Sequence, residues 1–337
     1  MKILLVGYHN PHFTNTMVWR EKAVEYLGHE LLTFDDRSFL FPGRLRDKSP
    51  FLHQWDLERL NKSLVQFVDK HSPDICLIVG GQRILSSSVI EIKKRGIWTA
   101  LWTSDVPIDF KNILQAAPFY DHLFCAGSEA VDIFHKEGYR QVTWLPFACD
   151  QNFHKPFSLT GKEAKAYGRD LVFVGSYYPN RAKTLESLAA FDIGVWGPYW
   201  SKLSFDSKLK LKAVDVKMNF DQWVKIYSAS KICVVIHYQD ENCLCHQISP
   251  KVFEAMACGC FVLTDRQKDA SKVFQDKEHL VFFDNESDLC QKAQYYLDND
   301  EKRRQIARDA QAFVLASHRY QDRIKKILDT FQGKVGL

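Results

Sequence analysis

One short stretch of the chain combines a helix start, a cation and an acid. It reads SPKVFE, so Ser249 and Pro250 precede Lys251 and Glu254. A hydroxyl residue followed by proline is typical of the first residues of a helix, where backbone N–H groups lack helical partners. Those amides, the helix dipole and Lys251 would bind an anion, and Glu254 lies one turn later on the same face. The stretch therefore predicts a nucleotide site, with phosphates at the helix start and ribose hydroxyls at Glu254. A helix acid paired to a neighbouring lysine is the alternative for Glu254.

A second group of polar residues directly follows an apolar run, LVFVGSYYPNR. Gly175 and Ser176 would form a strand-end loop whose backbone donors meet the phosphates. Arg181 would add a guanidinium, whose planar fork donates two bonds to phosphate. A tight turn with a surface arginine is the alternative. Trp196 lies in the later WGPYW segment. It is predicted to flank the nucleobase of the bound nucleotide, with core packing as its alternative.

Three residues that follow strands are candidates for a general base. Asp105 ends the apolar run in LWTSDVP, and His9 and His12 lie in the loop after the first strand. Asp105 is alternatively the cap of a turn, and the two histidines are alternatively solvent-exposed loop residues.

Short β-branched runs alternate with helical patterns along the 337 residues, a length that favours two domains over one. Runs at 3–6, 30–33, 75–79, 99–102, 122–125 and 142–145 predict the strands of the first domain. The alternation stops in a Pro- and Gly-containing segment and restarts at Leu171. We predict two Rossmann-like, doubly wound parallel-sheet domains of an α/β protein, facing across a cleft. Their bounds are 1–150 and 171–318, with a linker at 151–170 and a terminal helix at 319–337.

Several classes of function are disfavoured by what the sequence lacks. The loop after Gly7 has no further glycines, so the dinucleotide-binding fingerprint is absent, and neither a P-loop nor GxSxG occurs. The formal charge of +4 is mild, which disfavours a nucleic-acid partner. No apolar run approaches a membrane span or a secretory signal, so we expect a cytoplasmic protein and leave peripheral membrane contact open. The nine cysteines lie mostly in apolar runs, as reduced core thiols do.

The segment KVFEAMACGCFVLTD resembles the donor-site helix of GT-B glycosyltransferases of the group 1 type, especially the branch related to the CgeB spore-maturation proteins. WLPFACD, LVFVGSYYPNR and YSASKICVVIH follow the order seen in that family, and the resemblance extends from Ile75 to Leu328. It implies that Glu254 holds the ribose, that Lys251 meets the diphosphate, and that the last helix returns to the first domain. Many retaining members carry a second Glu eight residues before the helix Glu. Here that residue is His246, which leaves the contact to the sugar and the stereochemistry open.

The expected activity is transfer of a sugar from a nucleoside diphosphate donor, with a UDP-sugar expected, to a glycan, protein or small-molecule acceptor. The second domain would bind the donor and the first domain the acceptor. The resemblance implies metal-independent chemistry, without metal ligands or a cofactor. Two alternatives stay open: a catalytically silent nucleotide-sugar binding protein, and a nucleotide-sugar epimerase of similar two-domain build.

Overall fold

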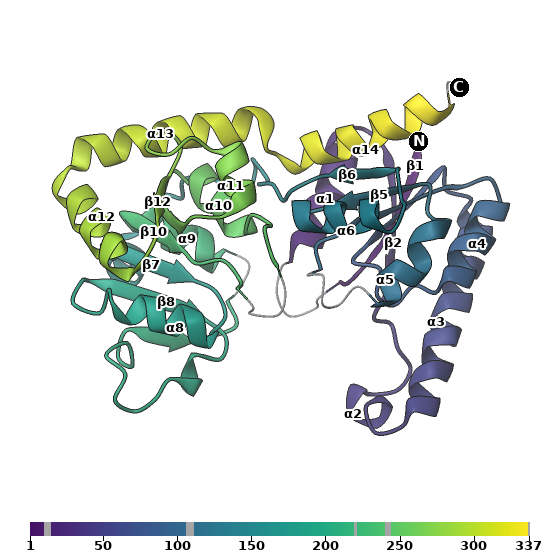
Figure 1. Ribbon diagram of the computed structural model, residues 1–337, viewed down its shortest axis with the longest axis horizontal. Helices are drawn as coiled ribbons and strands as arrows, with labels where there is room; N and C mark the ends of the chain where they lie inside the picture. The colour runs from purple at the N-terminus through teal and green to yellow at the C-terminus, as the bar shows by residue number, and fades with distance from the viewer. Residues whose placement is uncertain (10–14, 106–110, 219–220, 240–243, 336–337) are drawn as a thin grey trace.

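The computed structural model describes residues 1–337 except 10–14, 106–110, 219–220, 240–243 and 336–337. The chain forms two parallel six-stranded sheets, each flanked by helices, and the two units lie side by side (Figure 1). This arrangement confirms the predicted fold class. Both faces of each sheet are covered, which explains why the strands are continuous apolar runs rather than alternating ones.

The first sheet has the strand order β2-β1-β3-β4-β5-β6. The order reverses between β1 and β3, and ligands of open parallel sheets bind at such a switch point, beyond the carboxyl ends of the strands. The strands are β1 (Lys2–Gly7), β2 (Glu30–Asp35), β3 (Ile75–Val79), β4 (Trp98–Thr103), β5 (His122–Cys125) and β6 (Val142–Trp144). The helices are α1 (Thr16–Tyr26), α2 (Gly43–Arg46), α3 (Pro50–His71), α4 (Ser86–Lys94), α5 (Lys111–Ala116) and α6 (Ser128–Lys136).

The second sheet has the order β12-β11-β10-β7-β8-β9, with its switch point between β7 and β10. Its strands are β7 (Leu171–Val174), β8 (Ile193–Gly197), β9 (Ala213–Asp215), β10 (Ile232–Val235), β11 (Phe261–Asp265) and β12 (Val281–Phe283). Its helices are α7 (Gly161–Tyr167), α8 (Pro179–Glu186), α9 (Gln222–Ala229), α10 (Pro250–Ala257), α11 (Lys268–Val273), α12 (Glu286–Asp298) and α13 (Asp300–Ser317).

Two crossings of the chain between the units pair with each other. The Cys149 amide donates to the His318 carbonyl at 3.0 Å, and the Tyr320 amide donates to the Cys149 carbonyl at 2.9 Å. After this crossing α14 (Tyr320–Val335) runs along the first unit (Figure 1). Its apolar residues Tyr320, Ile324, Ile327 and Leu328 share a buried cluster with residues of β1, β3 and α1.

A buried polar contact also joins the two units. The backbone amide and the hydroxyl of Ser128, the first residue of α6, donate to the Asp269 carboxylate in α11 at 2.7 and 2.5 Å. The Asp269 side chain is fully buried. A carboxylate at a helix start satisfies an unpartnered amide and interacts favourably with the helix dipole. This contact therefore ties the second unit to the start of a first-unit helix.

Elsewhere in the described ranges, no cysteine forms a disulfide, and most of the cysteine side chains are buried. None of the helices in those ranges combines the length and the apolar character that crossing a bilayer requires.

Candidate functional site

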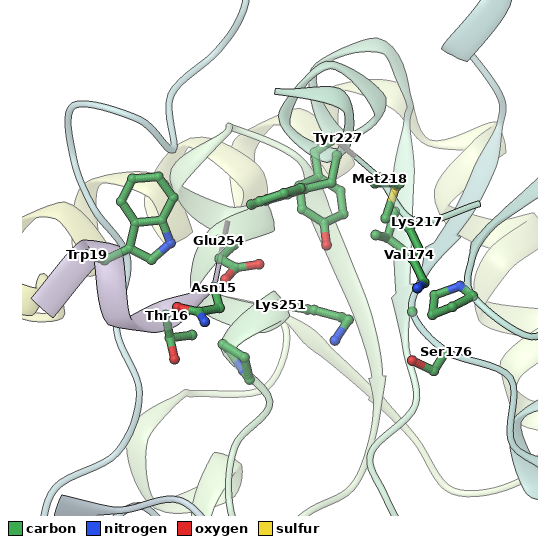
Figure 2. Close-up of a pocket in the computed structure, with 14 residues that line it drawn as sticks. Asn15, Thr16, Trp19, Val174, Ser176, Lys217, Met218, Tyr227, Lys251 and Glu254 are labelled. Atoms are coloured by element: carbon green, nitrogen blue, oxygen red, sulfur yellow. The ribbon is translucent and has the colours of Figure 1, made fainter. Parts of the chain in front are cut away.

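A cavity of about 280 Å³ lies where the start of α1 faces the carboxyl end of the second sheet. Figure 2 shows the α1 residues on one side, Val174, Ser176 and Lys217 on the other, and the α10 residues Lys251 and Glu254 between them. The cavity adjoins the end of β7, one of the two strands at the switch point of the second sheet. The lining residues are Asn15, Thr16, Trp19, Val174, Gly175, Ser176, Pro198, Lys217, Met218, Trp223, Tyr227, Pro250, Lys251 and Glu254.

Helix α10 is held by its apolar face, and its start is left open toward the cavity. Val252, Phe253 and Met256 are fully buried, so packing against the sheet fixes the helix axis. Ser249 occupies the N-cap position and Pro250 follows it, but the Ser249 hydroxyl accepts no hydrogen bond from the α10 amides. Pro250 has no N–H and the Val252 amide donates to the Ser249 backbone carbonyl at 3.1 Å, so the Lys251 amide is the one that stays available for an anion within the first three residues of the helix.

Lys251 passes beneath the end of β7 because residue 175 is a glycine. A Cβ at Gly175 would lie 3.2 Å from the Lys251 Cε and 3.1 Å from the Phe173 ring, closer than real Cβ atoms usually approach. Burial lowers the pKa of Lys251, and the nearby Arg181 cation lowers it further. Together, the neighbouring Lys251 and Arg181 cations favour the binding of an anion. Figure 2 shows the Lys251 amine directed into the cavity, as Ser176 is from the opposite wall.

The Glu254 carboxylate is buried at the inner end of the cavity, with 7% of the residue exposed. Burial raises its pKa to about 7, although the Lys251 cation opposes that rise. Its nearest ionisable partner is His154, whose Nε2 lies 4.0 Å from Oε1, too far for a hydrogen bond. Among the described residues, no side chain or backbone group donates a hydrogen bond to this carboxylate. Glu254 is therefore a buried acceptor that vicinal hydroxyls can reach.

His154 comes from the linker and was not identified from the sequence. Its Nδ1 accepts a hydrogen bond from the Asp150 amide at 2.9 Å, so the ring proton belongs on Nε2, the nitrogen that faces Glu254. Burial lowers the pKa of His154 to about 3, which keeps the ring neutral. The linker thus places a neutral ring, and no added charge, beside Glu254.

Arg181, Trp196 and His246 lie away from the walls of this cavity. The Arg181 guanidinium donates to the backbone carbonyls of Ile236 and Ser176 at 3.0 and 3.2 Å, so it braces the loops after β10 and β7. Trp196 is 7% exposed and belongs to a core cluster, which matches the alternative of core packing. His246 Nδ1 lies 3.9 Å from Glu129 Oε2 in α6, at the contact between the two units. The direct contacts predicted for these three residues with the donor stay predictions.

A second cavity, of about 360 Å³, adjoins the first one and shares Asn15 and Thr16 with it. It lies at the carboxyl ends of β1 to β4, around the switch point of the first sheet. Asp105 lines it, and a Cβ at Gly80 would lie 3.9 Å from Asp105 Oδ2. The other lining residues are Tyr8, Met17, Arg20, Asp36, Arg37, Val79, Gly80, Gly81, Gln82, Arg83 and Ser104.

His9, one of the two histidines proposed as alternative bases, is not part of the walls described for these cavities. His9 Nδ1 faces the Gly7 carbonyl at 3.1 Å, and Nε2 contacts the Glu21 carboxylate. The Glu21 carboxylate raises the pKa of His9 above its usual value. His12 lies outside the described residues. Of the two candidates within the described residues, Asp105 is therefore the one that lines a cavity wall.

Several lining residues were not identified from the sequence. Asn15 had a usable signal, because it caps α1 by accepting a hydrogen bond from the Met17 amide at 2.9 Å. Lys217 and Tyr227 carry no comparable local signal. Lys217 follows the edge strand β9 and Tyr227 lies within α9, so only the packing of the second unit brings them to the cavity.

Residues 180–329 match the model of a protein family described as glycosyl transferase-like. The matched segment contains α10 with Lys251 and Glu254. No curated protein was found whose sequence matches the chain significantly.

Solved structures resemble the whole chain in fold. HepE from Anabaena, in complex with UDP and glucose, has a TM-score of 0.71 at 13% identity, over 99% of this chain and 100% of that one. Sucrose-phosphate synthase from Thermosynechococcus elongatus has a TM-score of 0.70 at 11% identity, over 99% of each chain. A protein from Listeria monocytogenes assigned as a UDP-N-acetylglucosamine 2-epimerase has a TM-score of 0.64 at 12% identity, over 100% and 97%. At these identities the likeness establishes the fold, which is GT-B.

Proposed function

We propose that this protein is a glycosyltransferase that moves a sugar from a nucleoside diphosphate donor to the hydroxyl of an acceptor. The donor would occupy the interdomain cavity and the acceptor the adjoining first-domain cavity. The observation that carries this proposal is the Glu254 carboxylate, buried without a hydrogen-bond donor among the described residues, one turn behind Lys251 in a cavity at the switch point.

Each part of a nucleoside diphosphate has a matching group in the interdomain cavity. The diphosphate matches the open start of α10, the Lys251 ammonium and the Ser176 loop, and the ribose matches Glu254. Tyr227 and Trp223 offer apolar surface to the base. The glycosyl transferase-like match and the UDP and glucose bound to HepE favour UDP as the nucleotide.

In the proposed reaction, an acceptor oxygen attacks the anomeric carbon of the sugar. A new carbon–oxygen bond forms while the bond from that carbon to the β-phosphate oxygen breaks, and the nucleoside diphosphate leaves with the bonding electrons. The acceptor proton passes to Asp105 or, in a retaining route, to an oxygen of the leaving phosphate. Lys251 and the α10 dipole stabilise the charge that develops on the diphosphate. Closure of the two units around the donor excludes water that would otherwise hydrolyse it.

The proposal includes finer points that the residues favour. The cations at the interdomain cavity, which we call the donor cavity, act in place of a metal. Transfer should therefore survive EDTA, and strict dependence on Mg²⁺ or Mn²⁺ would contradict this point. Membership in the CgeB-related branch, the cytoplasmic location and the identity of the sugar stay predictions from the sequence.

Calorimetry with UDP and turnover assays with UDP-sugars test the proposal together. We expect saturable UDP binding and release of UDP from a UDP-sugar, at a rate that an acceptor increases. UDP binding without release from any of a panel of UDP-sugars would favour the silent binding protein. A change in the sugar of the donor without any acceptor would favour the epimerase, whose fold the Listeria protein shares. Absence of binding to UDP, GDP, dTDP and CMP would overturn the proposal.

A further inference from the structure

The first-domain cavity contains more guanidinium groups than its acids can pair. Arg20, Arg37 and Arg83 line it together with Asp36 and Asp105. These residues come from α1 and from the segments after β2, β3 and β4, so the fold alone brings them together. Three cations against two acids leave the cavity positive at neutral pH. The arginines also pair incompletely with the protein's own acceptors.

Arg20 is a buried cation with unused donors. It is 1% exposed, and its Nε and one terminal nitrogen have no hydrogen-bond partner among the described residues. Its other terminal nitrogen donates to the Thr16 hydroxyl at 2.7 Å, and the guanidinium stacks 4.2 Å from the centroid of Trp102. Because the Thr16 oxygen accepts from Arg20, its own proton is free to donate. Thr16 lines both cavities, so this proton lies where donor and acceptor would meet.

Arg37 and Arg83 form the outer walls with incomplete pairing. The closest acid oxygen to Arg83 is Asp36 Oδ2 at 3.8 Å, longer than a hydrogen bond. Arg37 stacks 3.7 Å from the Tyr8 ring centroid. Across the described ranges, neither guanidinium donates a hydrogen bond to a protein acceptor. Burial and the neighbouring Arg37 lower the pKa of Arg83, and burial raises the pKa of Asp36. The pKa shift of Arg83 reflects burial beside a second cation, whereas the pKa shift of Asp36 reflects mainly burial, against the opposing charges of Arg83 and Arg37.

We propose that the acceptor carries an anionic group, a phosphate or a carboxylate, bound by Arg37 and Arg83 while its reacting hydroxyl faces Thr16 and Asp105. Guanidinium groups suit this role because their planar forks donate paired hydrogen bonds to anionic oxygens. A cavity of about 360 Å³ accommodates a small molecule of monosaccharide size. The inference rests on the proposed function for its chemistry, but the anion-binding site itself exists with or without transfer.

The test is calorimetry with glucose 6-phosphate, glucuronate and glucose, each titrated with and without saturating UDP. We expect the anionic sugars to bind about tenfold or more tightly than glucose, because hydrogen bonds to charged groups are strong. Preference for glucose 6-phosphate identifies a phosphate site, and preference for glucuronate identifies a carboxylate site. Equal binding of all three sugars, or no binding of either anionic sugar, overturns the inference. Lack of UDP binding counts only against the donor site, because the titrations without UDP report on the first-domain cavity alone.

Two variants assign the effect to the cavity. Arg37→Gln and Arg83→Gln should each remove most of the preference for the anionic sugars and leave UDP affinity unchanged. Arg140→Gln is the matched control, since Arg140 is exposed and precedes β6 at the opposite edge of the same sheet. Arg37 is itself exposed, so its variant keeps the experiment valid if Arg83→Gln fails to fold. An unchanged preference in Arg37→Gln, or an equal loss in Arg140→Gln, would overturn the assignment.

Discussion

The two cavities of this protein are built in different ways. In the donor cavity the decisive groups, Lys251 and Glu254, lie three residues apart on one helix whose start is open. In the first-domain cavity the charged groups come from α1 and from three separate strand ends. The first arrangement is a local motif that one short stretch of sequence can hold. The second exists only when the sheet is assembled.

This difference separates binding from chemistry. The donor cavity presents an open helix start, one ammonium and one buried carboxylate, an arrangement suited to holding a nucleotide. The adjoining cavity presents Asp105 beside arginines, an arrangement suited to orienting and deprotonating a second substrate. Variants on the two sides should therefore change different kinetic quantities, and the following predictions test that separation.

The largest effect is expected for Asp105→Asn. The amide cannot accept the acceptor proton, so kcat should fall by about 10²- to 10⁴-fold, the usual contribution of a general base. UDP affinity should stay as in the parent protein, because Asp105 does not line the donor cavity as described. Steady-state kinetics with a UDP-sugar and calorimetry with UDP measure the two quantities.

Asp47→Asn serves as the control for Asp105→Asn, because Asp47 is an exposed acid of the same unit next to α2. Transfer at the parental rate in Asp105→Asn would instead favour proton removal by the leaving phosphate, as in a retaining route. Loss of UDP binding in this variant would show that the two cavities are not separable.

The next effect is expected for Glu254→Ala. Removing a charged hydrogen-bond acceptor should weaken UDP binding by about 1.5 to 3 kcal/mol. Calorimetry with UDP measures the change, and the affinity of the first-domain cavity for glucose 6-phosphate should be unaltered. Glu163→Ala is the control, since Glu163 is an acid of the second unit that caps α7 away from the cavity. Unchanged UDP affinity in Glu254→Ala would remove the main support for the nucleotide site.

The sequence was sufficient for the parts that depend on local patterns. The alternation of apolar runs and helical segments predicted both parallel sheets, and the SPKVFE stretch predicted an open helix start with Lys251 and Glu254. It was not sufficient where tertiary packing decides. The sequence pattern of α1 gives no sign that Arg20 belongs to a cavity. Only the folded structure shows it as a buried cation that donates to the Thr16 hydroxyl. Trp196 ends a strand like a site aromatic, yet the neighbouring glycines and helices enclose it in the core.

A smaller effect is expected at the contact between the two units. Asp269→Ala should lower the free energy of unfolding by about 1 to 3 kcal/mol, because the Ser128 amide and hydroxyl lose their buried acceptor. Urea denaturation measures this change, and small-angle scattering should show a more open average shape. UDP affinity should change little, since Asp269 is not among the residues that line the donor cavity.

Asp329→Ala, which removes an exposed helix ion pair with Lys325, is the control and should lower the free energy of unfolding by less than about 0.5 kcal/mol. Parental stability in Asp269→Ala would contradict the role of this contact.

The smallest expected effect is a pH dependence that belongs to the donor cavity alone. The pKa of Glu254 is raised to about 7, so the carboxyl is ionised at pH 8 and largely protonated at pH 6. The protonated form loses an acceptor for the ribose hydroxyls, and the affinity for UDP should therefore fall about tenfold from pH 8 to pH 6. The terminal phosphate of UDP titrates in the same range, near pH 6, and Glu254→Gln separates the two contributions, because the amide does not titrate and only the phosphate remains. The difference in pH dependence between the parent protein and this variant is the contribution of Glu254. Identical pH profiles for the two proteins would mean that the Glu254 carboxylate does not bind the ribose. The contrast between the donor cavity and the first-domain cavity would then rest on Lys251 alone.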